Sequence, residues 1–438
     1  MALTGTRIYV GFGFGAIQAG LFLYEAYQSG AFGRLVVAEV MPETLDAVRS
    51  AGGVFGVNIA HADHVERAHV GPVTLLNPAD DNDRAQLIEA IAEADEIGTA
   101  VPSVSYYASE GIESLHRILA LGLRRKTLSD GRRCIIYTAE NNNHAAETLE
   151  ALVMNEIPVD ERVAVAAHVR FLNTVIGKMS GWAGAAEIAG QQLMSLTPGS
   201  TRAFLVEAFN RILISQVTFP EPFVRGISAF EEKSELLPFE EAKLYGHNAT
   251  HALLAYLAME RSVALISDLR AAAGVIEFAQ AAFIQESGAA LIEKYGGLDG
   301  LFTKRGYRAY VDDLLVRMTN PYLRDTAERV GRDPARKLGW DDRLIGVMRL
   351  ALAHDILPVR YALGAAAAVA ALERAEGRDA LIGSALRERL LALWGESAPP
   401  GEERDKILRL VGAARVHLRS WAVAGYPPLE SWYMAETP

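Results

Sequence analysis

The chain has 438 residues, 50% of them hydrophobic and 22% charged, with a formal net charge of −11 at pH 7. This composition predicts a globular protein of roughly two to four domains, and it excludes a disordered, collagen-like or small disulfide-stapled chain. The acidic balance argues against a nucleic-acid partner. The single cysteine, Cys134, excludes an internal disulfide, a cysteine-based zinc site and an iron–sulfur cluster, and it fits a cytoplasmic location.

Apolar stretches of the sequence predict neither an export signal nor a membrane span. The stretch Ile8–Tyr24 contains four glycines and lacks a preceding cluster of positive charge. The alanine-rich run Leu363–Leu372 is too short for a bilayer, which needs ~20 residues. We therefore expect no membrane partner.

Short apolar runs alternate with helical patterns in the first third of the chain. The predicted strands are Arg7–Gly13, Leu35–Val40, Val70–Leu76, Ile97–Val101 and Cys134–Thr138. Helical spacing follows most of them, whereas the polar segment His61–His69 fits neither pattern. Strands that alternate with helices predict a parallel sheet covered on both faces, as in a doubly wound Rossmann-type fold.

The pattern changes near residue 195. The segment Gln191–Thr201 contains Pro198 and Gly199 and is typical of a linker. Helical periodicity then dominates, in His251–Glu260, Ala271–Lys294, Tyr307–Arg317, Arg343–Ala353, Tyr361–Arg374 and Ile407–Trp421. We expect an α/β domain over residues 1–195 and a mainly α-helical domain over residues 196–438.

A glycine-rich turn follows the first predicted strand. Gly13 and Gly15 supply the G-x-G of a dinucleotide-binding turn, but Gln18 stands where the third glycine of G-x-G-x-x-G belongs. A second frame, with Gly11, Gly13 and Ala16, fits G-x-G-x-x-A equally. The motif alone is weak, because a tight turn in an ordinary α/β core has the same sequence.

Residues at other predicted strand ends strengthen the dinucleotide interpretation. Glu39 ends the second strand, where an acidic side chain accepts hydrogen bonds from ribose hydroxyls and repels a 2′-phosphate. Val101 ends a further predicted strand and Asn141 follows another, at the edge where such folds bind ligands. Gly20 is suited to close helix–strand packing. We predict NAD as the cofactor.

Lys243, Asn248 and His251 form the pattern K-x₄-N-x₂-H. On an α-helix they fall at about 0°, 140° and 80°, so Asn248 and His251 share a face and Lys243 joins them if the helix begins or bends there. A lysine of lowered pKa can act as general base, an amide can polarise the reacting oxygen, and an imidazole can hold a second hydroxyl. The alternative is a solvated lysine beside two polar packing residues.

These motifs resemble the polyol-specific long-chain dehydrogenases, and in particular their polyol-phosphate branch. The signature K-L-x-x-x-N-x-x-H-A is matched by Lys243–Ala252, and Ala139-Glu140-Asn141 is similar to the family's (C/A)-(E/D)-N. Further similar stretches are Glu286–Ala289, Tyr295-Gly296, Asn320–Asp325, Arg329–Arg332, Pro334, Arg336–Leu338 and Asp342–Ile345. The resemblance covers residues 7–375.

The resemblance implies a Rossmann domain with a helical substrate domain and metal-free hydride transfer. It implies Lys243 as general base or acid, Asn141 and Asn248 as the groups that polarise the reacting oxygen, and His251 as a substrate ligand. The sequence agrees about the metal: it has no H-E-x-x-H motif, and the His61-x-x-His64 pair is better explained as a polar surface.

Substrate specificity is harder to predict. Gly177-Lys178 stands where the family usually has an Asp-Arg pair, and the lost carboxylate leaves the hydroxyl pattern of the substrate open. Phosphate contacts are expected from a cationic set: Arg329, Arg332, Arg336, Lys337 and Arg343. The alternative for this set is ion pairing with acidic neighbours, namely Glu328, Asp333, Asp341 and Asp342.

The leading prediction is an NAD-dependent oxidoreductase that interconverts a polyol phosphate and a keto-sugar phosphate, of the mannitol 1-phosphate and fructose 6-phosphate type. The alternative is the same chemistry on an unphosphorylated polyol or an aldonate. A third reading, a catalytically silent NAD-binding protein, is disfavoured because Lys243, Asn248 and His251 are all present. We expect a monomer or a small homo-oligomer.

Overall fold

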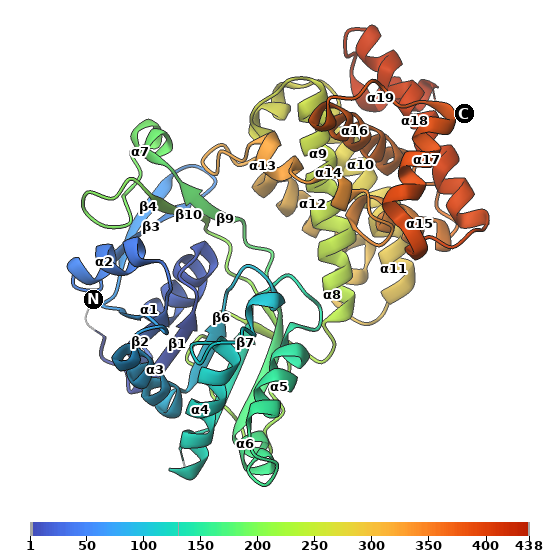
Figure 1. The fold of residues 1–438 in the computed structure, drawn as a ribbon. Coiled ribbons are helices and arrows are strands. Elements are labelled where there is room, and N and C mark those ends of the chain that lie inside the picture. Colours follow the sequence, from blue (N-terminus) through green and yellow to red (C-terminus); the bar gives the residue numbers. More distant parts are fainter. Residues whose placement is uncertain (1–2, 130, 437–438) are drawn as a thin grey trace. The chain divides into compact units, whose positions relative to one another are not determined.

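The computed structural model describes residues 3–129 and 131–436, which form two compact units (Figure 1). The first unit ends at Leu237 and the second begins at Pro238. The sequence analysis placed this boundary at 195/196. The difference arises because strands between residues 203 and 233 pair with earlier strands and so belong to the first unit.

A central eight-stranded sheet organises the first unit, in the order β12-β11-β8-β7-β6-β1-β2-β5. Its strands are β1 (Arg7–Phe12), β2 (Phe32–Ala38), β5 (Thr74–Leu76), β6 (Glu96–Thr99), β7 (Cys134–Thr138), β8 (Val169–Val175), β11 (Leu213–Ser215) and β12 (Glu231–Lys233). The six strands from β8 to β5 are all parallel, and counted along the chain they lie in the order 6-5-4-1-2-3. That is the strand order of the Rossmann fold, so the predicted fold class is confirmed.

Both faces of this sheet are buried, which explains its nearly continuous apolar strands. Val36 lies in one core with Leu119 of α4, whereas its neighbour Val37 lies in another core with Phe22 and Phe204. The helices of this unit are α1 (Tyr24–Ser29), α2 (Pro42–Ser50), α3 (Asp81–Glu93), α4 (Leu115–Leu128), α5 (Ala145–Glu156), α6 (Arg162–His168) and α7 (Ala185–Gln191), with a π-helical turn η1 (Gln18–Leu23) and a 3₁₀ turn η2 (Val104–Tyr106).

A second, four-stranded sheet lies in the same unit, in the order β4-β3-β10-β9. Its strands are β3 (Phe55–Ala60), β4 (Val65–Val70), β9 (Ser180–Ala183) and β10 (Ala203–Glu207). The polar segment 61–69, which the sequence left unassigned, contains most of the edge strand β4. The expected strand Val70–Leu76 is in fact the end of β4 and the whole of β5, separated by Gly71-Pro72-Val73.

The second unit is helical, as expected. Its α-helices are α8 (Leu237–Glu241), α9 (Ala249–Glu260), α10 (Val275–Ala281), α11 (Ala289–Tyr295), α12 (Lys304–Met318), α13 (Ala327–Gly331), α14 (Pro334–Lys337), α15 (Arg343–Ala353), α16 (Val359–Glu376), α17 (Gly383–Trp394), α18 (Glu402–Val423) and α19 (Leu429–Glu436). Two π-helical segments, η3 (Ala242–Asn248) and η5 (Ala282–Gly288), interrupt longer helices. Short 3₁₀ turns are η4 (Ile266–Ala271), η6 (Gly300–Phe302) and η7 (Gly395–Ser397).

Gly20 permits the close packing that the sequence suggested, but against the second sheet. A Cβ atom at Gly20 would lie 2.4 Å from Cγ1 of Val206 in β10. The helix after β1 therefore contacts β10 through a position that only glycine fits without displacement of its neighbour.

We predict that Gly20→Ala lowers the free energy of unfolding by ~1–3 kcal/mol, because the added methyl group overpacks this contact. The matched control is Gly190→Ala in α7, where no atom lies within 4 Å of the new Cβ. That variant should be neutral or more stable by up to ~1 kcal/mol, because alanine is the better helix former. Urea denaturation measures both, and equal stabilities of the two variants would contradict the prediction.

Candidate active site

Polar and glycine residues of the first unit meet at the carboxyl ends of its parallel strands. Backbone hydrogen bonds between the parallel strands continue just beyond the strand ends, from Gly13 N to Ala38 O (2.9 Å) and from Ala100 N to Phe12 O (3.0 Å). The strand order reverses between β1 and β6, so Gly13 and Ala100 lie at the topological switch point. Ligands of open α/β sheets bind at this crevice.

The structure favours the frame that begins at Gly13. This residue has φ of +80°, and a Cβ atom there would lie 2.8 Å from the carbonyl oxygen of Ala100. No atom lies within 4 Å of a Cβ placed at Gly15, which leaves its backbone open to a ligand. The first helical bond runs from Ala19 N to Gly15 O (2.9 Å), so the helix N-terminus that attracts a phosphate begins at these glycines.

Gln18 accounts for the remaining departure from the glycine motif. Its side chain is fully buried, and its Nε2 atom donates to the Tyr9 hydroxyl at 2.8 Å. A Cβ atom at Gly11 would lie 2.2 Å from the same Nε2 atom. Gly11 is therefore needed to accommodate Gln18, and the frame of Gly11, Gly13 and Ala16 has no independent support.

Glu39 follows β2 at the same edge and is only 8% exposed. Its carboxylate accepts three backbone N–H groups, from Phe14 (2.9 Å), Val40 (2.7 Å) and Met41 (2.7 Å). A carboxylate offers about four acceptor positions, so one remains for a ribose hydroxyl. Glu39 thus also fixes the glycine turn, a role that the sequence did not reveal.

Val101 is held at the edge by Glu140, a buried carboxylate after β7. Glu140 accepts from the backbone N–H of Val101 (2.9 Å) and from the hydroxyls of Thr99 (2.8 Å) and Tyr107. Burial raises the pKa of Glu140 above its ordinary value. The next residue, Asn141, is exposed on this unit, and its action on a substrate oxygen stays a prediction.

In the second unit, Lys243, Asn248 and His251 lie on one continuous helix that changes its winding. Residues 242–248 form the π-helix η3, and α9 continues from Ala249. A π-helix hydrogen-bonds residue i to i+5, so it brings Lys243 and Asn248, five residues apart, towards one face. The wider turn of the π-helix thus does what the sequence pattern required of a helix start or a bend near Lys243.

Lys243 is half-buried, and its charge is disfavoured. Burial and the guanidinium of Arg343 lower the pKa of Lys243 to about 8, although Glu240 partly opposes them. A lysine with this pKa exchanges its proton near neutral pH and is suited to general acid–base chemistry. Lys337 is buried as well, and desolvation together with Arg343 and Arg336 lowers its pKa to about 8.

His251 is neutral in this environment and faces a buried carboxylate. Burial, with Arg329 and Arg343 nearby, lowers the pKa of His251 to about 3. Its Nε2 atom lies 3.4 Å from Oδ2 of Asp325, a residue 4% exposed. The sequence analysis gave Asp325 no role; its only signal was its place in the Asn320–Asp325 motif.

Acidic neighbours already bind most of the cations expected to contact phosphate. Arg329 pairs with Asp325, Arg336 with Asp333 (3.3 Å), and Arg343 with Asp342 (2.7 Å). Lys337 Nζ donates to the carbonyl oxygen of Arg332, whose own side chain is exposed. Arg343 affects the pKa values of Lys243, His247, His251, Tyr256 and Lys337.

Within residues 3–129 and 131–436, no group of three or more His, Cys, Asp or Glu side chains could hold a metal ion. His61 and His64 stack on each other 4.4 Å apart, and each pairs with a carboxylate, Glu66 and Asp63 respectively. In the same part of the chain, no helix has the length and apolarity needed to cross a bilayer.

Residues 235–380 match the family model described as "Mannitol dehydrogenase C-terminal domain". This part of the chain is therefore similar to the C-terminal domains of mannitol dehydrogenases. It contains Lys243, Asn248 and His251, so the resemblance to polyol dehydrogenases inferred from these residues is confirmed.

Solved structures extend the likeness in fold to the whole chain. Mannitol 2-dehydrogenase of Pseudomonas fluorescens, in a ternary complex with NAD and D-mannitol, has a TM-score of 0.74 at 14% identity, covering 100% of this chain and 96% of that chain. D-sorbitol dehydrogenase in substrate-free form has a TM-score of 0.72 at 14% identity, covering 96% and 94%. The helices beyond the mannitol dehydrogenase C-terminal domain thus belong to a known fold.

We predict that the ammonium groups of Lys243 and Lys337 titrate near pH 8, while an exposed lysine titrates near ~10.4. NMR of ¹³C-lysine-labelled protein measures these transitions. Lys243→Arg and Lys337→Arg should each remove one of them and so assign it. Titration of every lysine near ~10.4 would show that burial does not disfavour their charge.

Proposed function

We propose that this chain is an NAD-dependent dehydrogenase that oxidises a secondary hydroxyl of a polyol. The observation that carries the proposal is Lys243, with a pKa of about 8, on a π-helical turn of a mannitol dehydrogenase C-terminal domain. The first unit fits the cofactor, because it has the Rossmann strand order, the open turn at Gly13 and Gly15, and Glu39 beside them.

In this mechanism neutral Lys243 accepts the proton of the reacting hydroxyl. Asn248 donates a hydrogen bond to the reacting oxygen, and Asn141 of the first unit is the second proposed donor. Neutral His251 binds another substrate hydroxyl: its Nε2 atom lies 3.4 Å from Oδ2 of Asp325 and has no hydrogen-bond partner among the described residues. NAD, held at the turn of Gly13 and Gly15 and by Glu39, would supply the acceptor for the hydride of the substrate carbon.

For the substrate, the ion pairs favour an unphosphorylated polyol over the polyol phosphate expected from the sequence. Arg329, Arg336 and Arg343 already have carboxylate partners, which a phosphate would have to displace. The similar structures carry the names mannitol 2-dehydrogenase and sorbitol dehydrogenase, which also supports a free polyol. An assay of NAD reduction with a panel of polyols, polyol phosphates and aldonates tests the proposal.

Lys243→Ala should lower kcat by ~10²–10⁴-fold and leave the NAD dissociation constant nearly unchanged, because the general base is lost and the cofactor binds to the other unit. Asn248→Ala should cost less, since it removes one of two proposed donors to the oxygen. Steady-state kinetics and NAD titration measure these effects. Near wild-type turnover of Lys243→Ala would refute the catalytic assignment.

The rate of polyol oxidation should rise with pH through about 8, as Lys243 loses its proton, and carbonyl reduction should fall over the same range. Lys337 has a similar pKa, so the control is Lys337→Arg, which stays charged at every pH tested. If Lys243 is the base, Lys337→Arg keeps the pH dependence of the oxidation rate. If the pH dependence disappears in Lys337→Arg, the group that titrates is Lys337.

NAD should exceed NADP in kcat/KM, because the carboxylate of Glu39 repels a 2′-phosphate. Glu39→Gln keeps an oxygen acceptor for Phe14 N but removes the charge, and should shift the preference towards NADP about tenfold or more. The measurement is the ratio of kcat/KM values for the two cofactors. An unchanged ratio in Glu39→Gln would exclude this role.

A further inference from the structure

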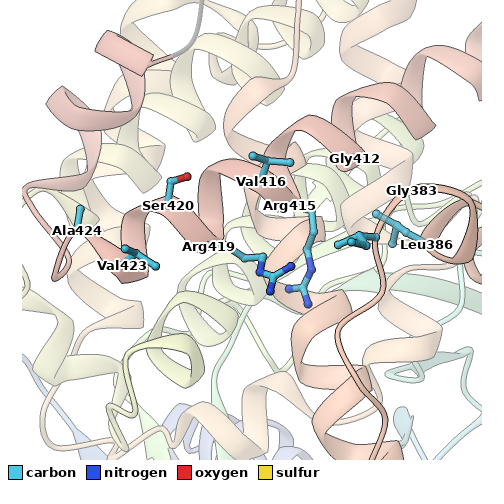
Figure 2. Close-up of a pocket in the computed structure, with 10 residues that line it drawn as sticks. Gly383, Leu386, Gly412, Arg415, Val416, Arg419, Ser420, Val423 and Ala424 are labelled. Atoms are coloured by element: carbon cyan, nitrogen blue, oxygen red, sulfur yellow. The ribbon is translucent and has the colours of Figure 1, made fainter.

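A surface groove in the second unit lies beyond the mannitol dehydrogenase C-terminal domain and has no part in the proposed function. It has a volume of about 530 Å³ and lies between α17 and α18 (Figure 2). It is lined by Ile382, Gly383, Leu386, Gly412, Arg415, Val416, Arg419, Ser420, Val423 and Ala424. Its volume lies within the range of small-molecule sites, about 300–1,000 Å³.

The lining exposes apolar side chains that a folded helical protein normally covers. Ile382 is 55% exposed, Val416 is 63% exposed and Val423 is 90% exposed. Val416 stands in a four-residue series with Gly412, Ser420 and Ala424, whose small side chains leave a furrow before and after it along α18 and its C-cap. The furrow therefore favours an apolar chain as its occupant.

Two arginines four residues apart on α18, Arg415 and Arg419, line this groove (Figure 2). Arg415 is 5% exposed and pairs with Glu373, yet its Nε atom is buried without a hydrogen-bond partner among the described residues. Arg419 is exposed and makes no ion pair with any carboxylate that the structure describes. Of the two arginines that line the groove, only Arg415 thus has a carboxylate partner, and the remaining positive charge favours an anion.

We propose that this groove binds a small amphiphilic carboxylate, whose apolar chain lies against Val416 and Val423 and whose carboxylate pairs with Arg419. A protein partner is disfavoured by size, because the groove offers ten lining residues and a stable interface uses about 20–30 residues a side. Charge complementarity selects a carboxylate over a neutral lipid, and the furrow selects an alkyl chain over a sugar.

Isothermal titration calorimetry on the full-length protein tests the proposal with octanoate, 1-octanol and acetate as probes. Octanoate should bind at one site per chain. Octanol lacks the charge and acetate lacks the chain, so each should bind about tenfold more weakly or worse. Equal binding of octanol and octanoate, or no octanoate binding below about 1 mM, would overturn the proposal.

Arg419→Gln should weaken octanoate binding about tenfold or more, because the carboxylate loses its free cationic partner. The matched control is Arg409→Gln, an exposed arginine of the same helix that does not line the groove. Polyol oxidation by both variants reports an intact fold. Octanoate binding that is equal in Arg419→Gln and wild type would refute the site.

Val416→Glu places a negative charge in the furrow and should abolish octanoate binding. Analytical ultracentrifugation of wild type and of the same variant tests the other occupant of the groove, a second copy of this chain. If wild type dimerises, Val416→Glu is monomeric and octanoate does not bind, the groove is an interface between two copies and the proposal is wrong.

Discussion

Two glycines after β1, Gly13 and Gly20, approach neighbouring residues so closely that a side chain would not fit at either position. These two contacts hold the helix after β1 in place, and the first unit is built around them. At its start, Gly13 touches the carbonyl oxygen of Ala100, which ties the β1 turn to the loop after β6. Seven residues further on, Gly20 lies against Val206 of the second sheet. The helix is therefore fixed between two sheets, and its N-terminus is fixed at the switch point of the parallel sheet, where we propose that NAD binds.

In the second unit the comparable constraint is a change of helix type. Sequence periodicity assumes 3.6 residues per turn, and on that assumption Lys243 lies apart from Asn248 and His251. The π-helical winding of η3 removes the difference, but no residue of the motif signals it. Nor could the sequence show the electrostatics: the pKa of Lys243 depends on its burial and then on Arg343, a hundred residues away in the chain. Residue types and spacing predicted the set, and only the fold revealed its environment.

The parallel part of the Rossmann sheet was predictable, because its strands are buried on both faces and appear as apolar runs; Cys134–Thr138 was predicted to the residue. The second sheet was not. Its edge strand β4 has exposed polar residues such as Glu66 and Arg67, which do not resemble a strand. Because β10 belongs to that sheet, the first unit extends to Leu237, and the domain boundary expected at 195 was wrong as well.

The second sheet also imposes an order on how the first unit is assembled. Strand β10 pairs with β3 in parallel, yet it begins at Ala203, 143 residues after β3 ends at Ala60 (203 − 60). During synthesis, the β3–β4 hairpin and the helix after β1 therefore wait for more than half of the unit to emerge. Until then one edge of β3 has unpaired backbone groups, and Gly20 lacks its contact with Val206. Such a non-local pairing is slow to form, so the helix that follows the glycine turn becomes fixed only late in folding.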